Sequence, residues 1–325
     1  MRTLSFCRGL MLAVLTGSVS AQSPSADNYP TKPIRVVLPF GAPGGASDIV
    51  ARLISARLAE VWGQQVLFDP RNGAGGILGT EIVAKAAPDG YTYLITGPAH
   101  AINLALHNKL PYDTLADFTP VSLVYEVANI LVVHPSVPAR SVKELIAHAR
   151  ANPGMLTYGS AGNGTSQHLA GELFSKMVNV KMIHVPYKSG AGAATDLLGG
   201  RLNLTFGSNT SLPNVRAGKL FALGVTSSHR LAALPDLPTI AEAGLPDYEC
   251  TAWYAMFAPA RTPRAMIDKV QGEFTRALTS ADVKEKLAAQ MIESIGSRPA
   301  ELDAFLKREI AKWSVIVKES GAKAE

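Results

Sequence analysis

Hydrophobic and polar residues alternate along the first part of the chain with two different periods. Residues 34–40 (IRVVLPF) are mostly β-branched or apolar and end in a turn of glycine and proline, which predicts a strand. From Ile49 to Trp62 the apolar residues recur every three or four positions, as they do on one face of a helix. Shorter β runs follow at 66–69 and 93–96, with the glycine-rich segment 72–79 and a helix between them. This order of elements predicts an α/β fold with a largely parallel sheet.

The middle third of the chain repeats this pattern. Residues 130–133 form an apolar β run, and Ser141 with Glu144 three positions later is a capping box that predicts the start of a helix. A strand beginning at Thr157 passes into a glycine-rich loop, and a helix follows from about Thr165 to Met177. Further strands are predicted at 181–185, 202–206 and 221–225.

The two repeats predict two Rossmann-like lobes joined by a hinge. The first lobe comprises residues 22–126 together with 250–325, and the second comprises 127–249. The last part of the chain would form a strand at 251–258 and helices near 263–279, 282–290 and 299–319, which return to cover the first lobe. The chain would then cross between the lobes twice, near Glu126 and Cys250, and two crossings are typical of a hinge.

The first 21 residues have the layout of a secretory signal. Arg2 and Arg8 flank a stretch without charges that continues through Leu15 and ends at Ala21. We expect cleavage before Gln22 and export to the periplasm. The apolar run of about a dozen residues is shorter than the roughly 18 residues that a membrane-spanning helix needs.

Charge and cysteine content narrow the class of protein further. The net charge of +5 falls to +3 when the two arginines of the signal leave, and no basic cluster concentrates it, so nucleic-acid binding is not expected. Of the 2 cysteines, Cys7 lies in the signal and Cys250 remains alone, so we expect no disulfide within the mature chain.

Three glycine-rich loops, at 39–48, 159–168 and 187–196, each follow a predicted strand and precede a helix. Glycines let backbone N–H groups point at an anion, and the following helix presents its positive N-terminal end. The hydroxyls of Ser47, Ser160, Thr165 and Ser166 would add donors. Each loop is equally explained by helix capping without any ligand, with Ser47 or Thr165 as caps. The segment 72–79 lacks such hydroxyls and is interpreted as structural.

The motifs of common enzymes and cofactor sites do not occur. The chain has no G-x-S-x-G elbow and no Walker lysine loop, and the near-match to a dinucleotide fingerprint at 190–195 lacks its third glycine and the acidic residue that should follow. Ser160 and His168 could suggest a nucleophile and base, but no acid stands at a recognisable spacing. The remaining candidates, His100, His107 and His184, are too scattered for a metal site. No catalytic residue, metal or cofactor is therefore expected.

Several motifs together carry a family resemblance. They cover nearly the whole mature chain in order: YPTKPIRVVLPFGAPGGASDIVARL, NGAGGILGT, PDGYTYLITG, GSAGNGTSQHLAGELF, VPYKSGAGAATDLLGGRL and LPNVRAGKLFALGVTS. The chain resembles the receptors of tripartite tricarboxylate transporters, the Bug-type solute-binding proteins. The resemblance implies a type II periplasmic-binding-protein fold that holds a carboxylate between the lobes and delivers it to a membrane permease.

The resemblance also indicates where the ligand would bind. The first ligand loop corresponds to 40–48, the carboxylate loop of the second lobe to 160–165 with His168 behind it, and residues 96–100 would also face the cleft. In many relatives an acidic residue stands at the position of Gly207, and its absence here favours a plain or aromatic acid over an amino acid. The expected ligand-binding residues are Phe40, Ala42, Gly44, Gly45, Ser47, Asp48, Thr96, Gly97, Ser160, Ala161, Gly162, Asn163, Gly164, Thr165, His168, Tyr187, Gly207 and Ser208.

The expected function is that of an exported, monomeric solute-binding protein. It would capture a di- or tricarboxylate or an aromatic acid, with one carboxylate on residues 160–165 and loop 40–47 closing over the other end. Its partners would be the permease subunits of a tripartite transporter. Two alternatives stay open: a receptor that signals to a membrane sensor, and an extracytoplasmic enzyme that uses the same cleft.

Overall fold

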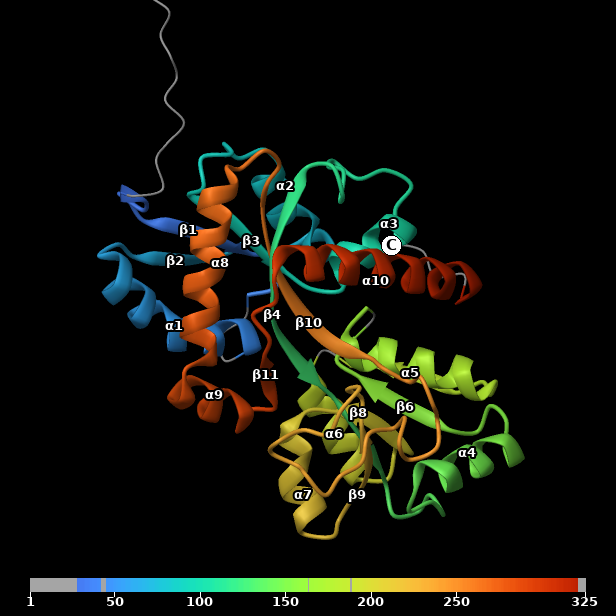
Figure 1. Cartoon of the computed structure of the whole chain (residues 1–325). Helices are drawn as coiled ribbons and strands as arrows, with labels where there is room; N and C mark the ends of the chain where they lie inside the picture. Colours follow the sequence, from blue (N-terminus) through green and yellow to red (C-terminus); the bar gives the residue numbers. More distant parts are fainter. Residues whose placement is uncertain (1–27, 42–44, 163, 188, 321–325) are drawn as a thin grey trace, which may run out of the picture.

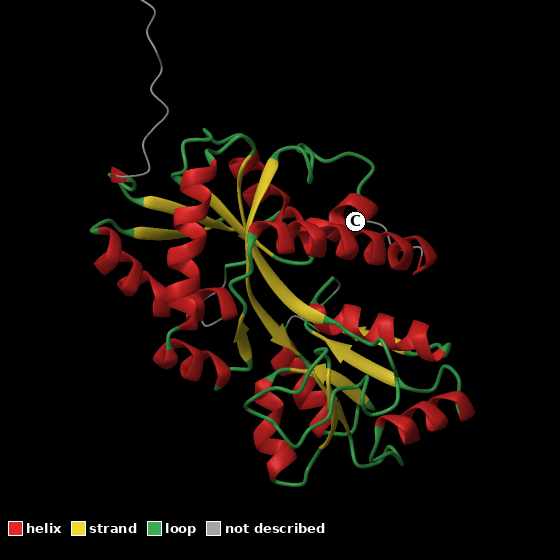
Figure 2. Ribbon diagram, in the orientation of Figure 1, coloured by secondary structure: helices red, strands yellow, loops and turns green. Residues whose placement is uncertain are grey.

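Two mixed β-sheets, each flanked by helices, form the centres of two lobes (Figures 1 and 2). A computed structural model of the chain describes residues 28–41, 45–162, 164–187 and 189–320. The predicted signal at 1–21 and its cleavage site lie outside these residues. Among the helices that are described, none is both long and apolar enough to cross a membrane. The α/β fold with two lobes is thus confirmed.

The first lobe is built on a six-stranded sheet with the order β11-β4-β10-β3-β1-β2. Only the pairs β1–β2 and β1–β3 are parallel, and the other neighbours run antiparallel. The strands are β1 (Ile34–Leu38), β2 (Val66–Pro70), β3 (Thr92–Thr96), β4 (Phe118–Ala128), β10 (Thr251–Pro259) and β11 (Ile292–Ser294). Sequence analysis did not predict β4 and β11.

The second lobe has a five-stranded sheet with the order β7-β6-β8-β5-β9. Here β6 pairs in parallel with β7 and β8, whereas β5 runs antiparallel to β8 and β9. The strands are β5 (Ile130–Val133), β6 (Thr157–Ser160), β7 (Ile183–Pro186), β8 (Leu204–Gly207) and β9 (Phe221–Val225). The lobe boundaries at 126/127 and 249/250 stay a prediction.

The prediction of a largely parallel sheet is wrong for both lobes, and the two crossings explain why. The chain leaves the first lobe along β4 and returns along β10, so these two strands run in opposite directions and pair antiparallel (Figure 1). The strand β5 continues the outgoing direction into the second sheet almost directly after β4. In the second lobe β5 follows β4 after one residue and pairs antiparallel with both β8 and β9.

Helices cover both sheets, and those that follow β10 return to the first lobe (Figure 1). There α8 and α9 pack near α1, while α10 lies along α3 and β4. The first lobe holds α1 (Ala46–Trp62), α2 (Ile77–Ala84), α3 (Ala99–Leu106), α8 (Arg264–Thr279), α9 (Ala281–Ala288) and α10 (Pro299–Ser320). The second holds α4 (Val142–Ala151), α5 (Ser166–Val178), α6 (Gly190–Leu198) and α7 (Leu212–Arg216).

A buried glutamate fixes α10 on the returning strand. Glu309 accepts hydrogen bonds from the indole N–H of Trp253 at 2.7 Å and of Trp313 at 2.9 Å. Lys312 lies 2.5 Å from the other carboxylate oxygen. The charge of this buried group is thereby paired and hydrogen-bonded, which is the condition under which a carboxylate tolerates burial.

Both crossings between the lobes are tied to one residue, Thr226. Its hydroxyl accepts a hydrogen bond from the N–H of Asn129, the residue between β4 and β5, and its own N–H donates to the Asn129 carbonyl. Its carbonyl accepts from the N–H of Cys250, which precedes β10. Thr226 is fully buried. The outgoing and returning segments are therefore held at the same point of the second lobe.

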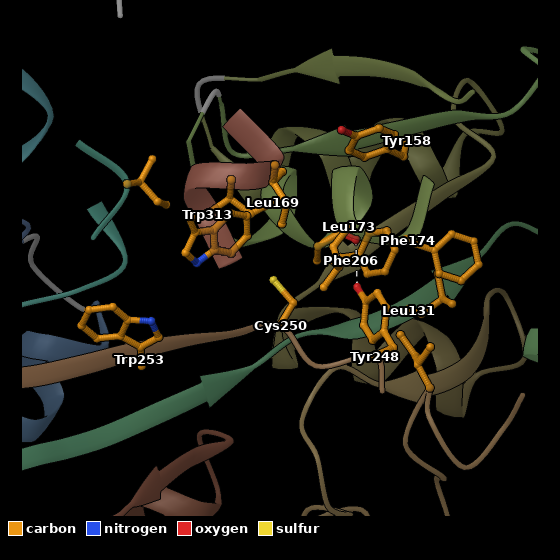
Figure 3. Close-up of a cluster of buried hydrophobic side chains, with 14 of the residues drawn as sticks. Leu131, Tyr158, Leu169, Leu173, Phe174, Phe206, Tyr248, Cys250, Trp253 and Trp313 are labelled. Carbon is orange, nitrogen blue, oxygen red and sulfur yellow. Dashed lines mark hydrogen bonds between the residues drawn. The ribbon is translucent and has the colours of Figure 1, made fainter. Parts of the chain in front are cut away.

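Apolar side chains of both lobes meet beside this point (Figure 3). Trp253 and Trp313 lie on one side of the buried Cys250, and the cluster around Phe206 lies on the other. The hydroxyl of Tyr248, on the returning segment, donates to the carbonyl of Ala170 in α5 at 2.8 Å. Burial raises the pKa of the Cys250 thiol to about 12, so the thiol stays neutral.

A carboxyl group near the hinge is partly buried among other acids. Glu126 of β4 stands opposite Glu293 of β11 in the strand register. Burial, reinforced by the charge of Glu249, raises the pKa of Glu126 from its ordinary 4.5 to about 7. Glu293 and Glu309 add to the same repulsion. Ionisation of Glu126 therefore works against the folded arrangement of the hinge strands.

The substitution Glu126→Gln should stabilise the protein above neutral pH. The stabilising contribution of protonated Glu126 is present below pH 4.5 and is lost as the pH rises through about 7. At pH 8 we expect the variant to gain about 2 kcal/mol of unfolding free energy over the wild type, and at pH 5 much less. Urea denaturation at the two pH values measures the difference. The exposed Glu285→Gln on α9 is the control, and an equal effect of Glu126→Gln at both pH values would contradict the account.

Candidate ligand-binding site

The loop after β1 leads into the N-terminus of α1. Ala42 and Gly44 lie outside the described residues, and Phe40 is 41% exposed. Gly45 is the N-cap of α1 and makes no side-chain capping bond. Ser47 is buried, and its hydroxyl lies 2.8 Å from that of Tyr125 on β4. The alternative in which Ser47 caps the helix is therefore wrong, because Ser47 stands inside the first turn.

The glycine-rich segment 72–79 contacts the start of this loop. The side chain of Asn72 donates to the carbonyl of Gly41 at 2.8 Å. Gly76 has a φ of 86°, and a Cβ at this position would come within 2.6 Å of the Phe40 ring. A glycine is thus required both by the backbone conformation and by the aromatic ring. This arrangement agrees with a structural role for residues 72–79.

Asp48, in the first turn of α1, forms an ion pair with Arg52 one turn later at 3.0 Å. The positive end of the α1 dipole favours a carboxylate at this place.

Thr96 is buried at the end of β3, and Gly97 follows it beside the carbonyl of Trp253, to which a Cβ on Gly97 would come within 3.0 Å. Because β1 and β3 are parallel neighbours, residues 40–41 and 96–97 leave the sheet at the same edge.

His100 lies deeper than the resemblance implied. The ring is fully buried among Tyr112, Phe118 and Phe257, at centroid distances of 6.3, 5.1 and 4.8 Å. Burial lowers the pKa of His100 to about 3, so the ring is neutral. In this structure His100 belongs to the core of the first lobe and does not line a cleft.

The second-lobe loop connects β6 to α5, and its described N–H groups all have acceptors within the lobe. Ala161 donates to the side-chain oxygen of Gln167 at 2.8 Å and Gly162 to the hydroxyl of Ser160 at 3.1 Å. Gly164 donates to Nδ1 of His168 at 3.1 Å. Thr165 donates to the Gly162 carbonyl at 3.4 Å, and Asn163 lies outside the described residues.

Thr165 closes this loop as the N-cap of α5. Its hydroxyl donates to the Gly162 carbonyl at 2.8 Å and accepts from the N–H of His168 at 3.4 Å. The capping function considered for Thr165 is therefore confirmed. Capping and ligand binding do not exclude each other here, since the cap fixes the shape of the loop whose N–H groups an anion would meet.

Ser160 is held from behind by a histidine that sequence analysis did not select. The Ser160 hydroxyl is fully buried and lies 2.6 Å from Nε2 of His184 on β7. The His184 ring stacks on that of His168, with the centroids 4.1 Å apart, and on Tyr158 at 4.8 Å. The serine hydroxyl thus shapes the loop, and in this conformation it does not face solvent.

Glu172 of α5 completes the same cluster. It accepts a hydrogen bond from the hydroxyl of Tyr158 at 2.5 Å and lies 3.8 Å from Nε2 of His168. The ring of Tyr158 fills the space beside Gly171, where a Cβ would come within 2.2 Å of it. The cluster therefore joins β6, β7 and α5 directly beneath the loop.

The third glycine-rich segment is mostly helix. The helix α6 begins at Gly190 with Ser189 as its N-cap, so the predicted loop 187–196 is wrong beyond its first residues. Tyr187 donates its hydroxyl to Asp196 at 2.7 Å, and Arg201 pairs with the same carboxylate at 2.5 Å. The backbone N–H of Tyr187 donates to the Ser160 carbonyl, which places this segment next to the second-lobe loop.

The end of β8 has little room for a side chain at residue 207. A Cβ on Gly207 would come within 2.6 Å of the Ser211 hydroxyl, so an acidic residue here would require Ser211 to move. The Ser208 hydroxyl lies 2.9 Å from that of Thr210. The candidate residues thus form two groups, one on each lobe, and those of the second lobe lie around 160–168, 187–190 and 207–208.

Comparison with known proteins identifies the family. Residues 50–322 match the model of the tripartite tricarboxylate transporter family receptor. The chain belongs to this receptor family. It is 41% identical over 313 residues to a Pseudomonas sp. protein encoded in the tcbD-tcbE intergenic region, covering 96% of this chain and 92% of the relative. BugT of Bordetella pertussis is 37% identical over 302 residues, with 92% of each chain covered.

Solved structures agree with this assignment. The receptor is similar to the Rhodopseudomonas palustris protein Rpa4515 with adipate, at a TM-score of 0.75 and 38% identity over 91% of this chain and 99% of that one. It is also similar to MatC from Rhodopseudomonas palustris with bound malate, at a TM-score of 0.71 and 32% identity over 89% and 100% of the two chains. The periplasmic-binding-protein fold is therefore confirmed.

Sequence analysis did not select the cluster behind the loop, which consists of His184, Glu172, Tyr158 and Gln167. Gln167 and Glu172 lie within the motif at 159–174, but neither is a hydroxyl or a glycine, and the hydrogen-bonded partners in this cluster are 6 to 24 positions apart in sequence. The parallel pairing of β6 with β7 places Tyr158 directly beside His184. Only a correct pairing of these two strands could have indicated that His184 lies behind Ser160.

The stacked imidazoles should make the receptor sensitive to acid. Burial, reinforced by His168, lowers the pKa of His184 from 6.5 to about 4, and burial lowers that of His168 as well. A ring that stays neutral in the folded state favours folding at neutral pH, and this contribution is lost as the pH falls from 6.5 toward 4. Two positive rings 4.1 Å apart would repel each other.

We therefore expect His184→Gln to lose less stability than the wild type between pH 6.5 and pH 4. Glutamine keeps a polar group near Ser160 and has no charge to gain. The difference should be about 1 kcal/mol, because the ring is partly exposed and its charge is partly screened. Thermal unfolding across this pH range measures it, with His107→Gln in the other lobe as the control. Identical acid profiles of wild type and His184→Gln would refute the explanation.

Proposed function

We propose that the receptor captures a small carboxylic acid between its lobes and passes it to the permease of a tripartite transporter. The observation that carries this proposal is the similarity, over nine tenths of the chain, to a receptor with adipate and to one with bound malate. Both acids carry two carboxylates. A related solved structure is the periplasmic binding protein BugD, which supports export to the periplasm. We propose that the signal is cleaved before Gln22.

The second-lobe loop is the proposed seat of one carboxylate. It combines glycines, the N-cap of a 13-residue helix and a set of closely spaced N–H groups. A carboxylate at this place would gain charge-assisted hydrogen bonds and the favourable field of α5. The other end of the acid would meet Phe40 and the described residues 45–48 of the first lobe, partly through water.

Because the candidate residues lie on both lobes, we expect the lobes to close around the acid. An acid that contacts one lobe only would bind the open and closed forms equally and shift nothing, whereas contacts from both lobes favour the closed form. The hinge segments at Asn129 and Cys250 would absorb the motion. We propose that the receptor acts as a monomer and that the permease subunits recognise the closed form.

The geometry at residue 207 supports a plain or aromatic acid as the ligand. The Ser211 hydroxyl occupies the space where a carboxylate on residue 207 would project. The described residues of this strand end thus offer no anionic partner for an amine at that position. Amino acids are accordingly expected to bind more weakly than dicarboxylates of similar length.

The Ser160–His184 pair is a weaker basis for an enzymatic function. The distance of 2.6 Å would suit a nucleophile and its base. However, the serine hydroxyl is fully buried, so a substrate in the cleft does not reach it in this conformation. The arrangement is better suited to holding the loop than to attacking a ligand. A receptor that signals to a membrane sensor would use the same binding site.

A thermal-shift screen tests the proposed class of ligand. Adipate, malate, citrate, benzoate and glutamate would each be added to the purified receptor. A true ligand at hundredfold excess over its Kd should stabilise the folded state by about 2.7 kcal/mol. We expect a dicarboxylate or an aromatic acid to shift the melt, and glutamate to shift it least. If none of the carboxylates shifts the melt, the proposed function is wrong.

Substitution of one helix cap, with another cap of the same lobe as control, tests the assigned loop. Thr165→Ala should weaken binding of the acid found in the screen about tenfold, because the loop loses its bond to Gly162. Ser141 caps α4 in the same way, and Ser141→Ala is the matched control. Both changes should cost about 1 kcal/mol of stability, and only the first should change affinity. Calorimetric titration measures both, and equal affinities would remove the loop from the site.

A further inference from the structure

The described N–H groups of the second-lobe loop are already occupied in the free receptor. Ala161, Gly162 and Gly164 donate to Gln167, Ser160 and His168 respectively. An unpaired N–H group in a partly buried loop is costly, so the protein supplies its own acceptors. A carboxylate that bonds to the N–H of Ala161, Gly162 or Gly164 must therefore displace the side chain that accepts from it.

The three acceptor side chains differ in the contacts that hold them in place. The Ser160 hydroxyl is fully buried against His184 at 2.6 Å. The ring of His168 is stacked on His184, with the centroids 4.1 Å apart. Gln167 has an unbranched, half-buried side chain, and within the described residues its only hydrogen bond is the one from Ala161. Gln167 is therefore the acceptor that gives way most easily.

The surroundings of the Gln167 amide also suit an anion. Gln167 is the second residue of α5, and its side-chain oxygen accepts from the Ala161 N–H at 2.8 Å. A carboxylate oxygen near a helix N-terminus is a stronger acceptor than a neutral amide oxygen. The Gln167 amide nitrogen faces the first residue of α6, since a Cβ on Gly190 would lie 3.0 Å from Nε2. The amide thus stands between the two glycine-rich segments of the lobe.

We infer that Gln167 competes with the ligand carboxylate for the N–H of Ala161 and so sets the affinity of the receptor. The inference rests on the proposed binding of a carboxylate at this loop. In the free receptor the glutamine oxygen satisfies Ala161, and on binding the carboxylate takes its place while the side chain turns away. Gln167 would then lower affinity without contributing to the bound state.

The substitution Gln167→Ala separates this role from a supporting one. A competitor, once removed, leaves the N–H of Ala161 free for the ligand, so affinity should increase about fivefold. If Gln167 instead supports the loop or donates to the bound acid, the same change should weaken binding. The probe is whichever of adipate, malate and benzoate gives the largest melt shift, and calorimetric titration measures its Kd. Weaker or unchanged binding by Gln167→Ala overturns the inference.

A second variant makes the competitor stronger. Gln167→Glu places a tethered carboxylate on the N–H of Ala161, and affinity should decrease at least about tenfold. Gln65→Glu, on an exposed part of the other lobe, adds the same charge as a control. The decrease should persist at about 1 M salt, where long-range repulsion of the acid is screened. A decrease that disappears with salt would show repulsion alone and would count against displacement.

The outcome also separates this inference from the proposed function. If no acid binds the wild type, the proposed function fails and the inference fails with it. If the wild type binds and Thr165→Ala weakens binding while Gln167→Ala does not tighten it, the loop is the site but Gln167 is no competitor. Opposite effects of Gln167→Ala and Gln167→Glu are expected only from displacement.

Discussion

Backbone N–H groups outside helices and strands need hydrogen-bond acceptors from other groups, and the architecture of this receptor depends on which groups supply them. Between β6 and α5 the chain turns through glycines, where neither strand nor helix supplies partners. The acceptors come from Ser160, Gln167 and His168, within a few residues of the groups they serve. The described N–H groups of the loop thus have acceptors before any ligand is present. In the proposed mode, binding an acid would be an exchange of one acceptor for a better one rather than the folding of a disordered segment.

The same need for partners governs the hinge. A chain that passes from one sheet to another leaves N–H and carbonyl groups unpaired at the crossing, and Thr226 pairs those of Asn129 and Cys250. Because the outgoing and returning strands run in opposite directions, the sheet of the first lobe contains antiparallel pairs at its centre. Local sequence pattern predicted the two lobes and most strands, but it could not reveal this pairing, which depends on residues more than a hundred positions apart.

The candidate site shows the same limit of sequence reasoning. Glycines and hydroxyls in one loop are visible in a sequence, so residues 160–165 could be selected before the structure was known. His184 and Glu172 could not, because their contribution arises from strand pairing and from the packing of α5. The segment 187–196 was misjudged for the opposite reason. Its glycines suggested a loop, yet Ser189 caps a helix that begins at Gly190, and the tertiary context overrides the low helix propensity of glycine.

The packing beneath the loop connects the candidate site to the hinge. Tyr158 fills the space beside Gly171 of α5, stacks on His184 and donates to Glu172, so that loop, strand and helix form one unit. The Tyr248 hydroxyl, on the segment that returns to the first lobe, is bonded to the carbonyl of Ala170 in the same helix. A displacement of α5 would therefore also move the returning segment. This connection favours the proposed closure by rotation of whole lobes, in which the loop would keep its shape and only the side chain that occupies it would have to leave.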